Sequence, residues 1–512
     1  MQDVRMPQVP RLPWLLAGLV AGLTGLATSY FLAMVLTVRD SPVVAVSELV
    51  IRVTPGPVVE HAIALLQHHD KPVLIGTIIV LLLVLFATAG WLAVRRWWWP
   101  YVIFVVLGVV GVGAVATEPR PQPLDYLPIA VGFATWIITF GAFRSMIVRT
   151  PSRDASAERG LPRRFVLTAG LTGVAALVLG AVGRSIGVGR RHVEETRRLL
   201  RLPGVTNRRP PDQARIGISG ITAWQTPAES FYQVDTAIAV PTIEPREWSL
   251  RIHGMVEKEI TLTYQQLLDR GLEQKWITLN CVSNPVGGPL IGNAWWSGLR
   301  LADLLAEAKP KPGADAVKQT SQDGWTCGTP LDALTDDRGA MLAVAMNGEP
   351  LPLEHGFPVR TIVPGLYGYV SACKWVVDME VTRFDDFTAY WTKRGWGEKG
   401  PVKIGSRIDV PRQDAEVQSG RINVAGMAWH QHVGIDSVEV SLDGGAWQQV
   451  RVAPSPTPDT WVQWGGSIEV EPGEHLLRVR ATSPGEAPQT GVIREVLPDG
   501  ATGWHVVQFR AM

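Results

Sequence analysis

The hydrophobic and polar positions divide the chain into an apolar first third and a longer remainder of mixed pattern. Each of five apolar runs reaches the roughly 20 residues that a helix needs to cross a bilayer. The first run could instead be a cleaved signal peptide, but its length and the four runs that follow favour an anchor. The pattern therefore predicts an all-α transmembrane bundle over residues 1–189 and a linker over residues 190–215. The five predicted helices cover residues 14–36, 73–94, 98–117, 127–148 and 165–186.

The remainder of the chain reads as two soluble domains. Over residues 216–400, short strand-like alternations are mixed with amphipathic helical patterns, which predicts an α+β domain. Over residues 401–512, short strands follow one another with turns between them, such as Asp443-Gly-Gly445, and no helical pattern intervenes. This spacing predicts an all-β sandwich of immunoglobulin-like type.

Arginines around the apolar runs predict how the chain is oriented in a membrane. Basic residues precede the first run, lie between the second and third, and gather between the fourth and fifth, over residues 144–164. All three groups fall on one side if every run crosses, which places the N-terminus in the cytoplasm. The soluble domains of this multi-pass cell-membrane protein are then extracytoplasmic. A basic tract at residues 190–209 falls on the opposite side, but the upstream groups are more numerous and agree with one another.

An arginine pair, Arg163-Arg164, directly precedes the fifth apolar run. Twin-arginine signals are read by the machinery that exports already folded proteins, and this modest Gly/Ala-rich run is of the kind that follows them. Two ordinary cytoplasmic arginines are the alternative. A cofactor-loaded domain that folds before export would favour twin-arginine translocation.

Composition and missing motifs narrow the classes of function. The formal net charge is +1, so no large basic surface indicates a nucleic-acid partner. The sequence contains no phosphate loop and no C-x-x-C, H-E-x-x-H or G-x-S-x-G pattern, which leaves P-loop nucleotide-binding, zinc-protease and serine-hydrolase functions unsupported. Few charged residues lie within the apolar runs, which disfavours transport.

The three cysteines all lie in the predicted α+β domain. Exported compartments permit disulfides, so a Cys327–Cys373 bond and three free thiols are both open alternatives. Cys281 follows the strand-like run at residues 276–279 and enters the turn-forming segment Val-Ser-Asn-Pro-Val-Gly-Gly-Pro. A thiol at the tip of a strand above a glycine-rich loop suits a nucleophile or a metal ligand, and a buried structural cysteine is the alternative.

From about residue 221 onward, the chain resembles the sulfite oxidase family of molybdopterin enzymes. With five apolar runs ahead of this region, the whole resembles membrane-bound molybdopterin-dependent oxidoreductases of actinobacterial type. The resemblance rests on the strand ending at Cys281, Phe231-Tyr-Gln-Val-Asp235, Trp296-Ser-Gly-Leu, Met346-Asn-Gly-Glu-Pro-Leu-Pro352, His355-Gly-Phe-Pro-Val-Arg360 and the segment ending Lys374-Trp375.

The resemblance implies a molybdenum–molybdopterin cofactor in residues 216–400 and a role for each matched residue. Cys281 would be the thiolate ligand of molybdenum, and His355 and Arg360 would hold the phosphate and the pterin. Lys374 and the neighbouring backbone would close over the same group. The residues assigned to the cofactor are Phe231, Tyr232, Val234, Asp235, Cys281, Ser321, His355, Arg360, Ala372, Cys373 and Lys374.

Two departures from the family pattern bear on the substrate. Sulfite oxidases follow the metal-binding cysteine with basic residues, whereas Val-Ser-Asn284-Pro follows Cys281 here, and Trp325 stands where they carry an active-site tyrosine. A dianion would lack its partners. We therefore expect a small neutral sulfoxide or N-oxide in an aromatic site, with Trp295, Trp296 and Trp325 as its walls and with Trp325 in a catalytic position.

The expected function is a membrane-anchored oxidoreductase that moves an oxygen atom or two electrons at an extracytoplasmic site. Without a haem motif it would need an external electron carrier, either a quinone or a cytochrome. Membrane lipid and a small-molecule substrate are the other expected partners, and the β-rich tail matches a dimerisation domain, so a homodimer is among them. The alternatives are a sulfite dehydrogenase and a non-catalytic exported binding scaffold that retains the fold.

Overall fold

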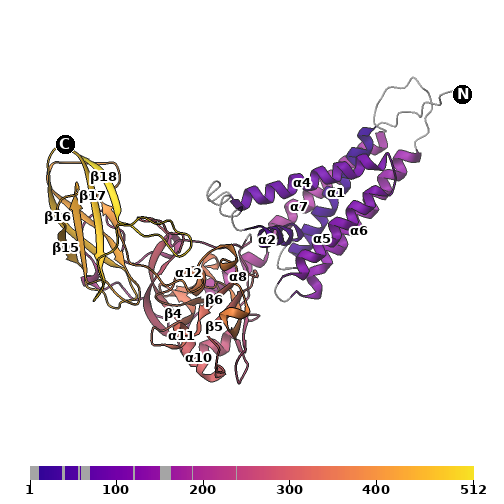
Figure 1. Ribbon diagram of the computed structural model, residues 1–512. Coiled ribbons are helices and arrows are strands. Elements are labelled where there is room, and N and C mark those ends of the chain that lie inside the picture. The colour runs from indigo at the N-terminus through magenta and orange to yellow at the C-terminus, as the bar shows by residue number, and fades with distance from the viewer. Residues whose placement is uncertain are drawn as a thin grey trace. The chain divides into compact units, whose positions relative to one another are not determined.

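The computed structural model describes residues 11–36, 41–55, 58, 70–118, 121–149, 163–186, 188–237 and 239–512. These residues form two compact units, one of Met1–Glu195 with Thr236–Thr242 and one of Thr196–Asp235 with Ile243–Met512. The first unit is helical and the second holds all of the strands (Figure 1).

The first unit contains five helices that are long and apolar enough to cross a membrane, as the sequence predicts. Arg5, Arg153 and Arg159, which contribute to the predicted orientation, lie outside the described residues, so the orientation stays a prediction. A shorter helix, α2 (Pro42–Val53), follows the first long one. The long helices are α1 (Arg11–Val35), α4 (Asp70–Ala93), α5 (Trp99–Ala116), α6 (Leu127–Arg149) and α7 (Arg163–Ile186).

Small residues let the long helices approach closely. A Cβ atom at Gly18 of α1 would lie 2.2 Å from the Phe86 carbonyl oxygen of α4, so only glycine fits there. The indole Nε1 of Trp136 donates a hydrogen bond of 2.9 Å to the Gly22 carbonyl. Trp136 also packs against the rings of Phe86 and Phe104, which form the interior of the bundle.

The predicted linker at residues 190–215 begins in a helix. Helix α8 (Val188–Leu199) is strongly charged, but Val193 is only 3% exposed. The boundary between the two compact units falls within this helix.

The α+β domain is built on two five-stranded sheets. One has the order β2-β1-β10-β5-β6, and the other runs β3-β4-β7-β8 with β9 also paired to β7. The mixture of strands and short helices confirms the predicted α+β class. The strands are β1 (Ser249–Gly254), β2 (Ile260–Thr263), β3 (Glu273–Asn280), β4 (Ile291–Arg300), β5 (Ala316–Ser321), β6 (Thr326–Pro330), β7 (Met341–Met346), β8 (Glu349–Pro350), β9 (Arg360–Ile362) and β10 (Val376–Thr382), and the helices are α9 (Tyr264–Asp269), α10 (Leu301–Ala308), α11 (Leu331–Thr335) and α12 (Gly368–Ser371).

The C-terminal part is β-rich and has no helix, as predicted. Its strands form one hydrogen-bonded series, β11-β13-β16-β15-β14-β17-β18-β12. Because β15 pairs with both β14 and β16, and β11 also lies against β17, the series folds over on itself around one core. The immunoglobulin-like type is not confirmed. The strands are β11 (Gly405–Val410), β12 (Ala415–Val417), β13 (Gly420–Trp429), β14 (Ser437–Leu442), β15 (Gln448–Val452), β16 (Val462–Val470), β17 (Gly473–Thr482) and β18 (His505–Ala511).

The α+β and β-rich parts are joined by buried polar contacts. The Trp224 indole donates to the Trp461 carbonyl at 3.1 Å, and the Trp461 indole donates to the Trp224 carbonyl at 2.7 Å. The Trp461 amide also donates to the Thr278 hydroxyl of β3 at 2.8 Å. Residues predicted to form two domains thus belong to one compact unit, and the β-rich part bears directly on the strand that leads to Cys281.

Candidate functional site

Cys281 directly follows β3 and begins a loop that closes on itself. Its amide donates to the Leu290 carbonyl at 2.9 Å, and the Asn284 side-chain oxygen accepts from the Leu290 amide at 2.9 Å. The thiol belongs to a residue that is only 7% exposed. Burial raises the pKa of the Cys281 thiol, and hydrogen bonds involving Ser283 oppose the rise. The thiol therefore stays protonated unless a metal ion displaces the proton.

The β-rich part packs against the same loop. Gly287 has a φ of +74°, and a Cβ atom there would lie 2.1 Å from the His505 ring of β18. The Arg407 guanidinium of β11 donates to the Gly288 carbonyl at 3.0 Å and pairs with Asp409 at 2.8 Å. Two strands of the β-rich part therefore fix the loop that presents Cys281.

Arg360, at the start of β9, is a buried cation with few partners. One nitrogen donates to the His355 carbonyl at 3.1 Å, and the guanidinium lies 5.4 Å from the centroid of the Trp296 ring. Its Nε is buried without a hydrogen-bond acceptor, and no ion pair to Arg360 occurs among the described residues. Burial lowers the pKa of Arg360 to about 10. Since a buried cation without a counter-charge costs several kcal/mol, the arrangement calls for an anion.

His355 lies beside Arg360 and is neutral. Its Nε2 is 2.9 Å from the Ala228 carbonyl oxygen, so Nε2 carries the proton and Nδ1 is left as an acceptor. Burial, followed by the charge of Arg360, lowers the pKa of His355 to about 4. The Phe231 ring meets the His355 ring edge-on, with centroids 5.7 Å apart, and meets Trp296 in the same way.

Lys374 and Asp235 form a second polar group next to these residues. The Lys374 Nζ lies 2.6 Å from an Asp235 carboxylate oxygen and donates to the Glu354 carbonyl at 3.0 Å. Ser321 donates to the Asp323 carboxylate, which is close enough to Asp235 and Lys374 for their charges to affect its pKa. Two residues predicted to contact the cofactor, Lys374 and Asp235, are thus paired with each other.

Two tyrosine hydroxyls lie near Cys281. Burial raises the pKa of Tyr232, and the nearby Cys281 raises it further while Arg360 lowers it. Burial raises the pKa of Tyr367 to about 12, with a smaller contribution from Cys281. Both phenols therefore remain protonated donors at neutral pH. Tyr232, Cys281 and Arg360 share one site, as the resemblance implied, whereas the position of Tyr367 was not predicted.

The contacts of the other residues predicted to belong to the site do not assign them a role. Val234 is 46% exposed. The amides of Ala372 and Cys373 already donate to the Gly368 carbonyl and the Thr361 hydroxyl, so their contacts with a cofactor stay a prediction. Trp325 lies in the turn between β5 and β6, where its amide is 3.4 Å from Asp323 Oδ1, and its catalytic position stays a prediction.

Cys327 and Cys373 are both free and buried, so they form no disulfide in the structure.

A small cavity of about 30 Å³ lies beside the Cys281 loop. Its lining includes Asn280, Asn284, Tyr367 and, from the β-rich part, Lys403 and Gln489. A larger cavity of about 340 Å³ shares Lys403 and Gln489 with it, among other lining residues. The Lys403 Nζ is 2.7 Å from Asp499 and donates to the Gly500 carbonyl at 3.0 Å. The lining of both cavities includes a cation, Lys403, from a segment distant in sequence, and the expected aromatic site walled by Trp295, Trp296 and Trp325 stays a prediction.

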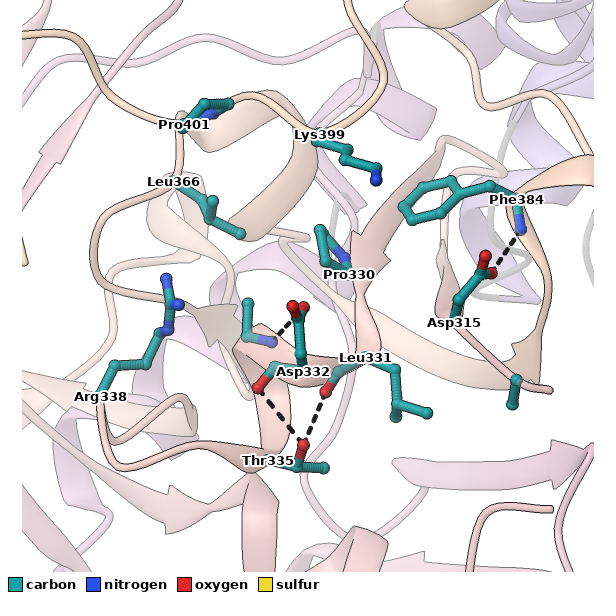
Figure 2. Close-up of a pocket in the computed structure, with 12 residues that line it drawn as sticks. Asp315, Pro330, Leu331, Asp332, Thr335, Arg338, Leu366, Phe384, Lys399 and Pro401 are labelled. Atoms are coloured by element: carbon teal, nitrogen blue, oxygen red, sulfur yellow. Dashed lines mark hydrogen bonds between the residues drawn. The ribbon is translucent and has the colours of Figure 1, made fainter. Parts of the chain in front are cut away.

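A separate cavity of about 590 Å³ is shown in Figure 2. It is lined by Leu366, the residue before Tyr367, and by Lys399 and Asp332, which both face its interior. The Asp332 carboxylate accepts a hydrogen bond of 2.7 Å from the Ala333 amide. Cys281, His355 and Arg360 are not part of its lining, so this cavity is distinct from the cofactor candidate site.

The residues present fit a pterin bearing a phosphate. Arg360 Nε and Asn280 Oδ1 are both buried without a partner among the described residues, one a donor and the other an acceptor. A phosphate accepts from a guanidinium, often with two parallel hydrogen bonds. A pterin ring carries amino and amide groups that need acceptors. Burying both orphan atoms in an empty protein would be costly, whereas a ligand of this kind would satisfy them.

The part of the chain that carries the candidate site is similar to known molybdopterin-binding proteins. A model of the oxidoreductase molybdopterin binding domain matches residues 237–391. An uncharacterized oxidoreductase of Bacillus subtilis, YuiH, is 31% identical over 154 residues, which cover 30% of this chain and 74% of that protein.

Two named enzymes are also similar over part of their length. Sulfite oxidase of Gallus gallus is 28% identical over 299 residues, covering 49% of this chain and 64% of the enzyme. A nitrate reductase [NADPH] of Emericella nidulans is 34% identical over 218 residues, covering 37% of this chain and 24% of the enzyme. The chain thus spans less than two thirds of each.

Replacing Arg360 by methionine is expected to stabilise the cofactor-free protein. The change removes a buried cation that has no counter-charge, so the free energy of unfolding should rise by about 1–4 kcal/mol. Arg407→Met is the matched control, because it leaves the buried Asp409 carboxylate without its ion-pair partner. This change should lower the free energy of unfolding by about 3–5 kcal/mol. Denaturant unfolding of protein made without pterin synthesis measures both. Equal destabilisation by the two changes would show that Arg360 is not an uncompensated charge.

The stability of the second unit is expected to fall as the pH drops from 6.5 to 4. The folded state holds His355 neutral, with a pKa of about 4, while the unfolded chain takes up a proton near pH 6.5. In this window the unfolded state binds more protons, so acid favours unfolding, by roughly 3 kcal/mol at most for this group. His355→Gln should flatten that part of the pH profile of thermal unfolding. An unchanged slope in the variant would contradict the assignment.

Proposed function

The chain belongs to the family of oxidoreductases with a molybdopterin binding domain, and from this premise we propose that it is a membrane-anchored molybdenum enzyme with an extracytoplasmic site. The observation that carries the proposal is Arg360, a buried cation whose Nε has no acceptor, beside the buried neutral His355. A scaffold that had lost the cofactor would gain stability by losing this charge. The retained charge favours an enzyme over the non-catalytic alternative.

Each residue of the site has a physical role in this proposal. Cys281 supplies a thiolate, a soft donor suited to molybdenum, and its raised pKa means that the metal itself must drive the loss of the proton. Arg360 binds the phosphate, and His355 offers Nδ1 as an acceptor to a pterin donor. Lys374, held by Asp235, adds positive charge beside the same group. When bound, the cofactor supplies the two-electron or oxygen-atom transfer.

The proposed substrate site combines the small cavity beside the Cys281 loop, which has room for one substrate oxygen atom, with the cavity of about 340 Å³ that shares Lys403 and Gln489 with it. Tyr367 stays protonated and can donate to an oxygen atom of the substrate, as donors in an oxyanion site do. The charge of Lys403 is balanced by Asp499 at 2.7 Å, so the site carries little net charge. We therefore propose a small neutral sulfoxide or N-oxide as substrate.

An oxyanion is the second candidate, and Lys403 is the observation that favours it. The similar enzymes named sulfite oxidase and nitrate reductase point to anionic substrates. If Asp499 turns away, Lys403 can pair with a sulfite-like anion. The two candidates differ in which side chain the reaction depends on, Tyr367 or Lys403.

The remaining elements of the proposal concern the setting of the enzyme. Five apolar helices anchor the chain, and the predicted orientation and the Arg163-Arg164 pair favour export of a folded domain by twin-arginine translocation. An external carrier, a quinone or a cytochrome, would exchange electrons with the site. A homodimer through an immunoglobulin-like β-rich part remains part of the proposal.

Cys281→Ser is expected to abolish turnover while the protein still folds. Loss of the sulfur ligand should lower activity by at least roughly 100-fold and remove the protein sulfur from the molybdenum X-ray absorption spectrum. Cys327→Ser, the same change at a buried free cysteine of β6, is the control and should leave that spectrum unchanged. An active Cys281→Ser enzyme with an unaltered metal spectrum would refute the assigned ligand.

Tyr367→Phe and Lys403→Gln are expected to separate the two substrate classes. For a neutral sulfoxide reduced with a dye as electron donor, Tyr367→Phe should lower kcat/KM by roughly 100-fold or more, because a donor to the developing charge is lost. Lys403→Gln should change it by less than about threefold. Tyr369→Phe is the control for Tyr367→Phe, because the Tyr369 hydroxyl already donates a hydrogen bond to the Gly397 carbonyl. A collapse of sulfite turnover in Lys403→Gln instead would identify an anionic substrate.

A further inference from the structure

Arg144 of α6 lies within a helix that is apolar enough to span a membrane. The candidate span runs from Pro123 to Val148, so the charge lies about one turn inside its end. Its guanidinium carbon is 4.8 Å from the centroid of the Trp97 ring. The Nε atom is buried and has no hydrogen-bond acceptor among the described residues. Ionisable groups at this depth are costly and normally have a partner.

Other cations and aromatic rings gather at the same end of the bundle. Arg95, in the connection from α4 to α5, stacks on Trp91 with its guanidinium carbon 4.7 Å from the ring centroid. Helix α7 begins at the exposed Arg163, and its Phe165 ring packs against Phe143, the residue before Arg144, at 5.3 Å. Cationic groups from three segments therefore lie at the same end of the bundle as Arg144.

Described acidic residues of the long helices lie at the other end. Asp70 begins α4, while Glu118 and Asp125 lie between the end of α5 and the start of α6. In this up-and-down arrangement, those positions are one bundle length away from Arg144, which is near the end of α6. Within the described residues, no ion pair involves Arg144; Asp154 and Glu158 of the connection from α6 to α7 lie outside the described residues.

The surfaces on either side of Arg144 are apolar and exposed. Val102 and Val105 of α5 are 39% and 48% exposed, and Val148 of α6 is 65% exposed. Trp98 and Trp99 stack at 4.7 Å and are also exposed, as aromatic side chains at a membrane interface are. A ligand at this place would meet cations with one part and aliphatic side chains with the other.

We propose that this end of the bundle binds the phosphate of an anionic phospholipid, with Arg144 as its principal donor. The guanidinium matches a phosphate with two parallel hydrogen bonds, and basic pockets between membrane helices bind such headgroups. The acyl chains lie along the exposed valines, which a free phosphate ion would not need. The inference rests on the membrane anchoring proposed above. A general preference of arginines for the cytoplasmic side would not by itself place Arg144 within the span and against the Trp97 ring.

The test uses the full-length protein in lipid nanodiscs of zwitterionic lipid doped with phosphatidylglycerol. Native mass spectrometry is expected to show retained phosphatidylglycerol on the wild type and roughly fivefold weaker binding for Arg144→Gln. Arg11→Gln removes an exposed arginine at the start of α1, on the same side, and should leave binding unchanged. Equal losses in the two variants would overturn the site and leave only a diffuse charge effect.

Further variants and conditions separate the alternatives. Arg144→Lys keeps the positive charge but loses the planar guanidinium, so lipid binding between that of the wild type and that of Arg144→Gln is expected. Trp97→Leu should weaken lipid binding although it removes no charge. Inorganic phosphate added to the phosphatidylglycerol-doped nanodiscs should not displace the lipid, and full displacement would assign the site to free phosphate. A protein released from membranes by alkaline carbonate would instead refute the anchoring, independently of any lipid result.

Discussion

The buried guanidinium of Arg360 is the constraint on which the account of this protein depends. Protein interiors do not hold an unpaired charge without a compensating partner, yet this side chain has one backbone acceptor, an aromatic face and an Nε without a partner. The neighbouring His355 cannot compensate, because it is neutral and its own pKa is lowered by the same charge. An anion in the site resolves the imbalance, and the phosphate of molybdopterin is the anion that the family supplies.

The rest of the second unit holds the site around that anion. Strand β3 carries Cys281 to one side of it, and the segment after α12 carries Lys374 to another. The β-rich part fixes the cysteine loop through Gly287, Gly288 and the reciprocal Trp224 and Trp461 contacts. It also contributes Lys403 to the cavity beside the loop. The β-rich part is therefore a wall of the proposed substrate site as well as a candidate dimerisation domain.

Local patterns were sufficient for the elements and for part of the site. Runs of about 20 apolar residues have one stable arrangement in a bilayer, so the five helices were predictable. The pairing order of β11 to β18 was not, because it depends on contacts between strands that are far apart in sequence. Motif residues His355 and Arg360 were found from their sequence context. Tyr367 and Lys403 were missed because only the tertiary fold brings them to Cys281, although Tyr367 follows the recognisable Val-Pro-Gly turn.

The measurement that tests the central claim most directly is the molybdenum and pterin content of the purified wild-type protein and of Arg360→Gln. The account predicts stoichiometric molybdenum and pterin in the wild type and loss of both in the variant, since the phosphate would lose its buried donor. A wild-type protein that is folded and membrane-inserted but contains neither, or a variant that retains the full complement of both, would contradict it.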